Sequence, residues 1–155
     1  MALRAATRLA SVAGVALLLG AVPAAARPAA GETERNRAVV TAFAHRFYDL
    51  RDVRGAFETF VAPDYIQHNP NIADGRDAAI AALRPIFEAP GSTFEVKRIV
   101  VDGDMAVIHL RGRSGASGEG GAVADIYRLA RGRIVEHWDV LQPIAAETVN
   151  PHPYF

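Results

Sequence analysis

Two short segments near the C-terminus place ionisable side chains among apolar ones on a common strand face. Alternate residues of a strand share a face, so the first segment brings together Val123, Asp125, Tyr127 and Leu129. The second segment does the same with Val135, His137, Asp139 and Leu141. A face that mixes carboxylates and an imidazole with apolar groups is typical of a cavity wall, where a few polar groups stand among hydrophobic ones.

These residue types can move protons. Two carboxylates in an apolar cavity cannot both ionise at low cost, because burial and like charge each penalise the second anion. We therefore expect either Asp125 or Asp139 to carry a proton near neutral pH. Histidine titrates close to neutrality, so His68 or His137 can act as a proton carrier.

Other interpretations of the same residues stay open. Asp125 and Asp139 could be rim residues paired with an arginine, either Arg111, Arg128 or Arg133. His68 could instead cap the turn before Pro70.

A metal site could also combine histidines with a carboxylate. Its histidines would be His68, His109 and His137. No helical histidine pair and no close ligand spacing supports such a site, so we expect neither a metal nor another cofactor.

Hydrophobic periodicity predicts the elements that position these groups. Three helices are expected first: one capped by Thr33, a second capped by Asp52 that carries Phe57, Phe60 and Val61, and a third from Asp77 to Phe87. The period then changes to two, which predicts hairpins over residues 93–111 and 122–141 around a glycine-rich loop at 112–121. This order predicts an α+β domain with helices packed on one face of an antiparallel sheet.

The composition excludes several classes of protein. Of 155 residues, 17 are basic and 17 acidic, and this balance argues against a polybasic nucleic-acid binder. The chain has no cysteine, so it has no disulfide framework, no thiolate zinc site and no cysteine nucleophile. We therefore expect no nucleic-acid partner.

The N-terminus has the pattern of a secretory signal. Arg4 and Arg8 precede an apolar run, and alanines 24–26 supply the small residues of a cleavage site. We expect residues 1–26 to be a signal peptide, 27–32 a polar leader and 33–155 the folded domain, which would be secreted or periplasmic. The alternative is an anchor that stays attached; after cleavage, no membrane contact is expected.

Several strings resemble SnoaL-like proteins of the nuclear transport factor 2-like superfamily. They are Tyr-Ile-Gln-His-Asn-Pro at 65–70, Asp-Gly at 74–75, Asp-Ile-Tyr-Arg-Leu at 125–129 and the segment 133–143. The similarity runs from about residue 35 to Phe155. It implies a cone-shaped fold with three helices around a strongly curved antiparallel sheet and a ligand pocket inside. Because the superfamily includes cyclases, isomerases, epoxide hydrolases, dehydratases and proteins without known reactions, the fold does not settle the function.

The resemblance also suggests roles for two carboxylates. Asp139 is similar in position to the acid/base carboxylate of the polyketide cyclases. Asp125 is similar in position to the protonated aspartate of ketosteroid isomerase, which donates to an oxyanion, so we assign the retained proton to Asp125. The isomerase base would fall near residues 68–69, where no carboxylate stands, and Tyr48 is only the nearest candidate for its oxyanion tyrosine.

We therefore expect a domain that binds a small, largely apolar carbonyl or hydroxyl compound and catalyses aldol condensation, cyclisation or isomerisation. Asp139 would abstract a proton, Asp125 would stabilise the enolate oxygen, and His68 or His137 would relay protons. The expected ligand contacts are Tyr65, Asn69, His109, Tyr127 and Leu141. The alternative is a binding or accessory protein without catalysis.

A homodimer is also expected. Members of the resembled family often pair through the outer sheet face, and alternation assigns three apolar side chains to that face: Ile134, Trp138 and Val140.

Overall fold

Helices come first along the chain. A computed structural model describes residues 30–155, and the predicted signal peptide therefore lies outside the described residues. Helix α1 (Ala30–Ala44) continues into one π-helical turn, η1 (His45–Asp49), which is followed by α2 (Val53–Phe60). Strand β1 (Val61–Gln67) and helix α3 (Arg76–Phe87) come next. Among the described residues, no helix combines the length and the apolar character needed to cross a bilayer.

The remaining strands form two hairpins that complete one sheet. They are β2 (Thr93–Asp102), β3 (Met105–Arg113), β4 (Gly121–Ala130) and β5 (Arg133–Pro143). The spatial order is β1-β5-β4-β3-β2, and every neighbouring pair is antiparallel except β1 with β5. The predicted α+β fold is thus confirmed. The parallel pair was missed, because it joins segments that are far apart in the sequence.

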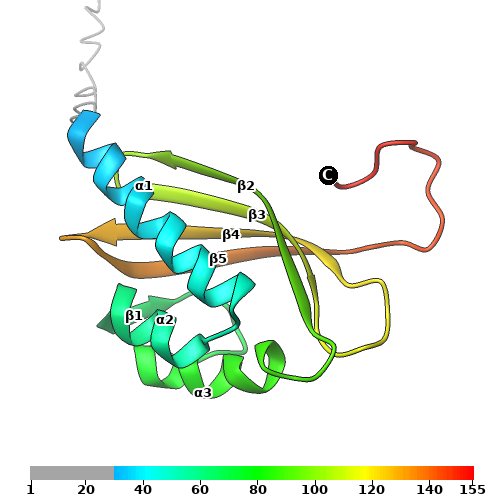
Figure 1. Cartoon of the computed structure of the whole chain (residues 1–155), viewed down its shortest axis with the longest axis horizontal. Coiled ribbons are helices and arrows are strands. Elements are labelled where there is room, and N and C mark those ends of the chain that lie inside the picture. Colours follow the sequence, from blue (N-terminus) through cyan, green and yellow to red (C-terminus); the bar gives the residue numbers. More distant parts are fainter. Residues whose placement is uncertain (1–29) are drawn as a thin grey trace, which may run out of the picture.

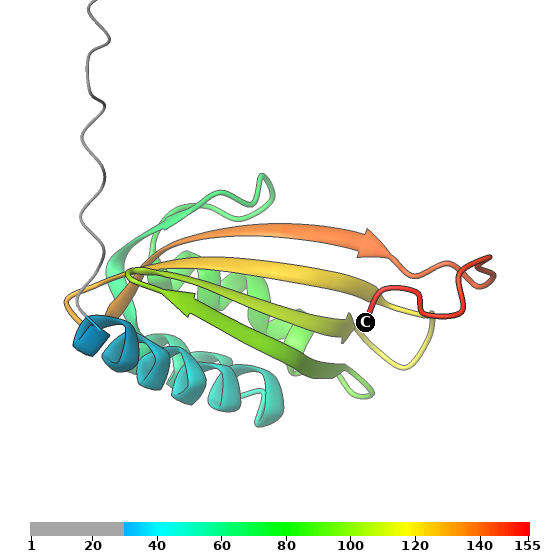
Figure 2. The same ribbon diagram turned by 90° about the horizontal axis from the view of Figure 1, so that it is seen from above.

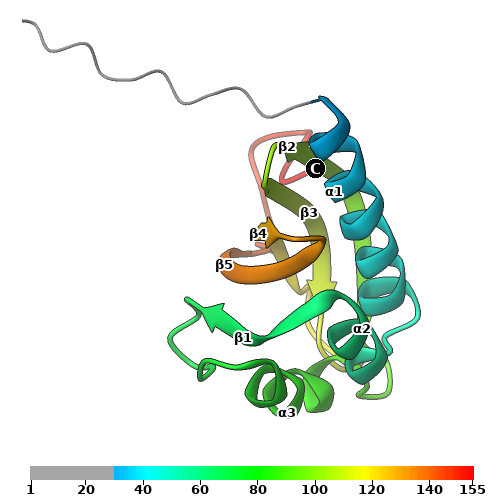
Figure 3. The same ribbon diagram turned by 90° about the vertical axis from the view of Figure 1, so that its left-hand side faces the viewer.

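The helices cover the concave side of a curved sheet. Helix α1 crosses one face of the sheet (Figure 1), and the strands bend along their length when seen from above (Figure 2). Strand β1 and helices α2 and α3 close the lower side (Figure 3). The core between these layers is rich in aromatic rings, including Phe43, Phe47, Phe57 and Tyr127, each at most 3% exposed.

Of two predicted helix caps, one is confirmed and the other is wrong. The Asp52 side chain accepts a hydrogen bond from the Gly55 backbone N–H and caps α2, as predicted. The predicted Thr33 cap is wrong, since α1 already begins at Ala30 and the Thr33 hydroxyl accepts a bond from Gly103 N–H in the β2–β3 turn (3.2 Å). Val61, assigned to the second helix from its apolar character, instead begins β1 and pairs with Ile134.

A bulge changes the face of one residue in β5. The β4–β5 register shifts between Arg128 and Leu129, so Leu129 pairs with Ile134 while Arg128 pairs with Glu136. Ile134 is therefore fully buried in the core. The expectation that Ile134 belongs to an exposed outer patch is wrong, because strict alternation does not continue across a bulge.

Candidate functional site

A cavity of about 310 Å³ lies between α3, the segment after β1 and the inner face of β4 and β5. This volume is at the lower end of the range for small-molecule sites. One part of its wall is polar and consists of Asn69, Asn71, Asp125, His137 and Asp139. The other part is apolar and consists of Phe47, Ile72, Ala82, Leu83, Ile86 and Leu141. The cavity thus has the mixed lining that the strand pattern indicated.

The β4–β5 register brings three ionisable groups together. Asp125 lies directly opposite Asp139, and Tyr127 lies opposite His137. One ligand-type atom from each of Asp125, His137 and Asp139 falls within 4.8 Å of the others. Asp125 and His137 are only 8% and 7% exposed, whereas Asp139 is half-buried.

The alternative in which arginines neutralise these aspartates is wrong. Arg128 forms its ion pair with Glu136, and Arg111 forms one with Glu119. Arg133 donates to the backbone carbonyls of residues 59 and 61. The described part of the chain therefore brings no arginine to either cavity aspartate.

Asp125 is held by a pair of buried phenols. The Tyr48 hydroxyl donates to Oδ2 of Asp125 (2.5 Å) and lies 2.8 Å from the Tyr127 hydroxyl. Burial, with the nearby Asp125 as a second cause, raises the pKa of both tyrosines far above the ordinary value. Both phenols therefore stay protonated. Since the Tyr48 proton is directed to Asp125, the Tyr127 hydroxyl must donate to Tyr48.

The sequence identifies Tyr48 only as the nearest candidate for an oxyanion donor. It comes from the π-helical turn η1, and that turn directs its hydroxyl towards β4. The hydroxyl stands behind Asp125 as a hydrogen-bond partner and does not line the cavity. A π-helical turn has no clear sequence signal, so the role of Tyr48 could not be assigned from sequence.

His137 connects Asp125 to Gln67. Its Nε2 lies 3.2 Å from Oδ1 of Asp125, and its Nδ1 lies 2.9 Å from Oε1 of Gln67. The Asn69 backbone N–H also donates to this Oε1 (3.0 Å), which identifies the atom as the amide oxygen. Nδ1 must therefore carry a hydrogen. Because Nε2 faces a carboxylate oxygen, one further proton is shared between His137 and Asp125.

Asp139 has a different environment. Its Oδ2 accepts a bond from Nδ2 of Asn69 (2.5 Å). It is more exposed than Asp125 and lies nearer the cavity mouth, on the same face as Leu141, which is 64% exposed. Asp139 is thus the carboxylate best placed to accept a proton from a bound molecule.

Two other expected ligand contacts lie behind the cavity wall. Tyr65 is 1% exposed, receives a long hydrogen bond from Gln67 Nε2 (3.4 Å) and stacks near His137. Tyr127 is also buried and stacks on the His137 ring at 4.8 Å. Neither lines the cavity, whereas Asn69 and Leu141 do. The two tyrosines therefore support the histidine and do not touch the ligand space.

His68 and His109 lie on the outer face of the sheet. His68 bonds Glu136 (2.8 Å) and stacks on Trp138 with ring centroids 4.6 Å apart. His109 lies near Arg98 and the Phe155 ring. The interpretation of His68 as a cavity proton carrier and of His109 as a ligand contact must therefore be corrected. His109 alternates with the buried Ile108 and Leu110 of β3, and His68 directly follows the buried Gln67 at the end of β1.

The cavity cluster has residue types that also bind divalent cations. However, Nε2 of His137 and Oδ1 of Asp125 already face each other at hydrogen-bond distance, and one proton satisfies both. The three-histidine set weighed from the sequence does not assemble, since His68 and His109 are on the other side of the sheet.

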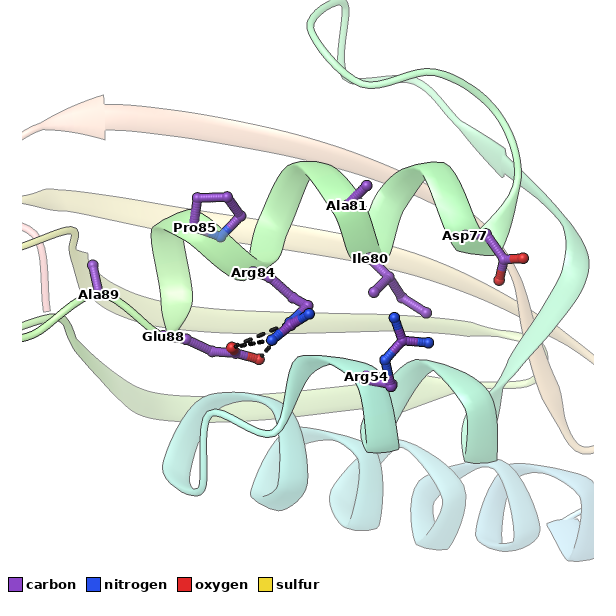
Figure 4. Close-up of a pocket in the computed structure, with 8 residues that line it drawn as sticks. All are labelled: Arg54, Asp77, Ile80, Ala81, Arg84, Pro85, Glu88 and Ala89. Carbon is purple, nitrogen blue, oxygen red and sulfur yellow. Dashed lines mark hydrogen bonds and ion pairs between the residues drawn. The ribbon is translucent and has the colours of Figure 1, made fainter.

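A second hollow, of about 520 Å³, is an open groove between α2 and α3 (Figure 4). Arg84 lies in this groove and forms hydrogen bonds with Glu88, while Arg54 bonds Glu58 one turn away on α2. These are exposed ion pairs within single helices. The groove therefore lacks the buried, closely coupled groups of the cavity.

The comparison with protein families agrees with the geometry. A family profile for the SnoaL-like domain matches residues 37–137. These residues include β1, the Asn69 segment and β5 as far as His137. No curated protein matches the chain.

Solved structures share the fold. An NTF2-like protein of unknown function from Mesorhizobium loti is 25% identical, covers 72% of this chain and 93% of its own, and has a TM-score of 0.63. A putative ketosteroid isomerase from Kribbella flavida is 20% identical (79% and 85% covered, TM-score 0.60). A putative SnoaL-like polyketide cyclase from Jannaschia is 19% identical (74% and 90% covered, TM-score 0.58). At these identities the last two show likeness of fold alone.

Proposed function

We propose that this chain, which belongs to the SnoaL-like domain family, catalyses proton transfer. The proton is removed from a carbon next to a carbonyl in a small, largely apolar compound. One observation carries the proposal. The polar end of an otherwise apolar cavity holds both a carboxylate able to accept a proton, Asp139, and a proton-sharing pair, Asp125 with His137. Acid and base are the two groups that enolisation requires.

In this reaction the Asp139 carboxylate removes a proton from the carbon. The electron pair of that C–H bond moves into the new carbon–carbon double bond, and the carbonyl electrons move to oxygen. The proton shared by Asp125 and His137 stabilises that oxygen when it turns from their mutual hydrogen bond towards the substrate. Return of the proton from Asp139 to another carbon of the skeleton gives isomerisation. Attack of the enolate on a second carbonyl gives aldol closure, in which the new alkoxide oxygen takes the proton held by Asp139.

The charges of the cavity limit its substrates. His137 is the only basic side chain among the described residues that line it, and two of the others are aspartates. A carboxylate or phosphate would be repelled by these acids and would find no arginine or lysine partner. We therefore propose an uncharged ketone or aldehyde, with or without hydroxyl groups, whose hydrocarbon part contacts Ile72, Leu83 and Ile86.

The test uses cyclohexanone and 2-tetralone as probes in deuterated buffer. Mass spectrometry should show exchange of the α-hydrogens above the buffer rate with the mature protein. Asp139→Asn should reduce this exchange by about 10²–10⁴-fold, the usual contribution of a placed acid/base group. Asp77→Asn, a change of an exposed aspartate in α3, should leave the rate unchanged.

Two results would count against catalysis. Exchange at the buffer rate, with ketone binding still visible in NMR spectra, would support the alternative of a non-catalytic binding protein. Exchange that survives Asp139→Asn would remove Asp139 from the role of base.

We also propose that residues 1–26 direct export and are then removed. The proposal rests on the two arginines, the apolar run and the alanines of the sequence. Mass spectrometry of protein from the periplasm of a Gram-negative host should find a chain that starts at or near Arg27. Recovery of only the full-length chain in membranes would support the retained anchor.

A homodimer through the outer sheet face is a further part of the proposal. Trp138 is partly exposed there, and Val140 is 62% exposed. Light scattering of the mature chain should give about twice the monomer mass, and Val140→Lys should give a monomer. A monomeric wild type at micromolar concentration would refute the dimer.

A further inference from the structure

We infer that the side-chain oxygen of Gln67 positions both the acid pair and the base of the cavity. It fixes the tautomer of His137, and it fixes the placement of the Asn69–Asp139 pair. This inference rests on the proposed function and assigns a part in it to a residue that lies outside the cavity lining. Gln67 belongs to β1, the strand that pairs in parallel with β5, and Gln67 pairs with His137 in that register.

The Gln67 amide has a fixed orientation. The Asn69 backbone N–H can only donate, and it lies 3.0 Å from Oε1 of Gln67. The amide nitrogen of Gln67 points the other way, to the Tyr65 hydroxyl. The amide is therefore held with its oxygen towards His137 and cannot turn over without losing both bonds. Gln67 is 9% exposed, so water does not readily replace them.

The amide oxygen also determines which nitrogen of His137 carries hydrogen. An amide oxygen at 2.9 Å from Nδ1 requires an N–H at that position. Nε2 is then left without a hydrogen in the neutral ring, facing Oδ1 of Asp125. Two lone pairs in contact repel, so loss of the shared proton is unfavourable. Gln67 thereby keeps Asp125 and His137 supplied with an acidic proton.

The same oxygen also fixes the base. By holding the Asn69 N–H it sets the backbone at that residue, and the Asn69 side chain then donates to Oδ2 of Asp139. The inferred chain of contacts runs from Gln67 through Asn69 to Asp139 on one side, and from Gln67 through His137 to Asp125 on the other.

The other groups around the pair give no competing explanation. Tyr48 faces it from η1, Tyr65 from β1 and Tyr127 from β4, and all three phenols remain neutral because burial raises the pKa of each. Asp139 on β5 is the other carboxylate beside the pair. Helix α3 contributes only apolar side chains to the cavity lining.

Two substitutions at Gln67 should act in opposite directions. In Gln67→Leu the requirement for Nδ1–H is lost, so the ring can place its hydrogen on Nε2 and donate to an ionised Asp125. The shared proton should then leave at a pH at least one unit lower than in the wild type. In Gln67→Glu a carboxylate keeps the Nδ1–H and stabilises the imidazolium, so the proton should leave at a pH at least one unit higher.

The experiment is NMR of the mature protein with 15N-labelled histidine, with His137→Gln used to assign the signals. Long-range 1H–15N spectra report the tautomer, and a pH titration reports the proton loss. We expect Nδ1–H in the wild type and Nε2–H in Gln67→Leu above neutral pH. Gln142→Leu changes the other glutamine, which is exposed on β5, and should resemble the wild type.

Asn69→Ala separates the two sides of the chain of contacts. It should lower the ketone exchange rate at least tenfold through Asp139 and leave the His137 tautomer and titration unchanged.

Because the NMR result does not depend on turnover, absence of exchange in the wild type would overturn the proposed function alone. A neutral His137 ring in the wild type with its hydrogen on Nε2 and none on Nδ1 would overturn the role of Gln67, and so would Nδ1–H with unchanged titration in Gln67→Leu. If Gln67→Leu does not fold, the test relies on Gln67→Glu, in which the shared proton should leave at a higher pH. Absence of that upward shift would overturn the role of Gln67.

Discussion

Strand β5 presents two clusters that contain the same residue types on opposite faces. On the inner face, His137 pairs with Asp125 inside the cavity, and both are less than 10% exposed. On the outer face, His68 pairs with Glu136, which also receives a bond from Arg128 (2.6 Å). Each cluster consists of a histidine and a carboxylate, yet only the outer one has an arginine.

The arginine accounts for the different chemistry of the two clusters. His68, with Arg128, holds the pKa of Glu136 below its ordinary value, so the outer carboxylate is an anion at neutral pH. The inner pair has phenols and an amide as neighbours, which donate or accept hydrogen bonds without supplying a positive charge. At the inner pair, a proton must therefore neutralise the carboxylate charge that Arg128 neutralises on the outer face. The inner pair therefore holds a proton that a substrate can use.

The largest expected contrast is in stability. Asp125→Ala removes the acceptor of the Tyr48 hydroxyl proton and the partner of His137 Nε2, and should lower the free energy of unfolding by about 3 kcal/mol. Glu136→Ala should have a much smaller effect, because its partners His68 and Arg128 remain accessible to water and ion pairs of such residues contribute little. Urea unfolding followed by circular dichroism measures both.

Asp125→Asn is the matched control for that comparison. Its amide can donate to Nε2 of His137 and accept from Tyr48, so its stability at pH 7 should equal or exceed that of the wild type. A loss as large as that of Asp125→Ala would show that the inner pair needs a full negative charge and does not share a proton with a neutral acid.

The second contrast is in catalysis. His137→Gln removes the proton-sharing partner of Asp125 and should slow ketone exchange by about 10²-fold, the lower end of the range for a placed acid/base group. His68→Gln should leave the rate within twofold of the wild type, since His68 lies on the outer face. Equal losses in the two variants would break the distinction between the faces.

A smaller effect is expected at Tyr48. Tyr48→Phe removes the hydroxyl that donates to Asp125 and should lower the free energy of unfolding by about 1–2 kcal/mol. Chemical denaturation measures this loss. Tyr154→Phe removes a hydroxyl that accepts from the Ala145 N–H in the exposed tail and should leave stability nearly unchanged. A loss of that size only in Tyr154→Phe would contradict the assigned importance of the phenol behind Asp125.

The smallest effect concerns acid stability at Glu136. Its folded-state pKa is lowered from 4.5, so its contribution to stability is present above pH 4.5 and is lost as pH falls through the lower folded value. The stability difference between the wild type and Glu136→Gln should therefore shrink between pH 5 and the acid limit of folding. A difference that grows on acidification would have the wrong sign.

Much of the fold and part of the site could be predicted from local patterns. Alternation along residues 123–129 and 137–141 indicated that Asp125, His137 and Asp139 face the interior, and the change of period located the hairpins. The bulge before Glu136 could not be predicted, because a one-residue insertion in the ladder leaves no clear sequence signal. It moved Ile134 from the expected outer patch to the core.

The sequence by itself determined which side chains could transfer protons, since strand period and residue type are local properties. Tertiary structure decided which of them meet. The parallel pairing of β1 with β5 brings Gln67 to His137 and Asn69 to Asp139, and the π-helical turn brings Tyr48 to Asp125. These contacts join residues about 70 or more positions apart, and only packing of the helices and the curved sheet fixes such distances.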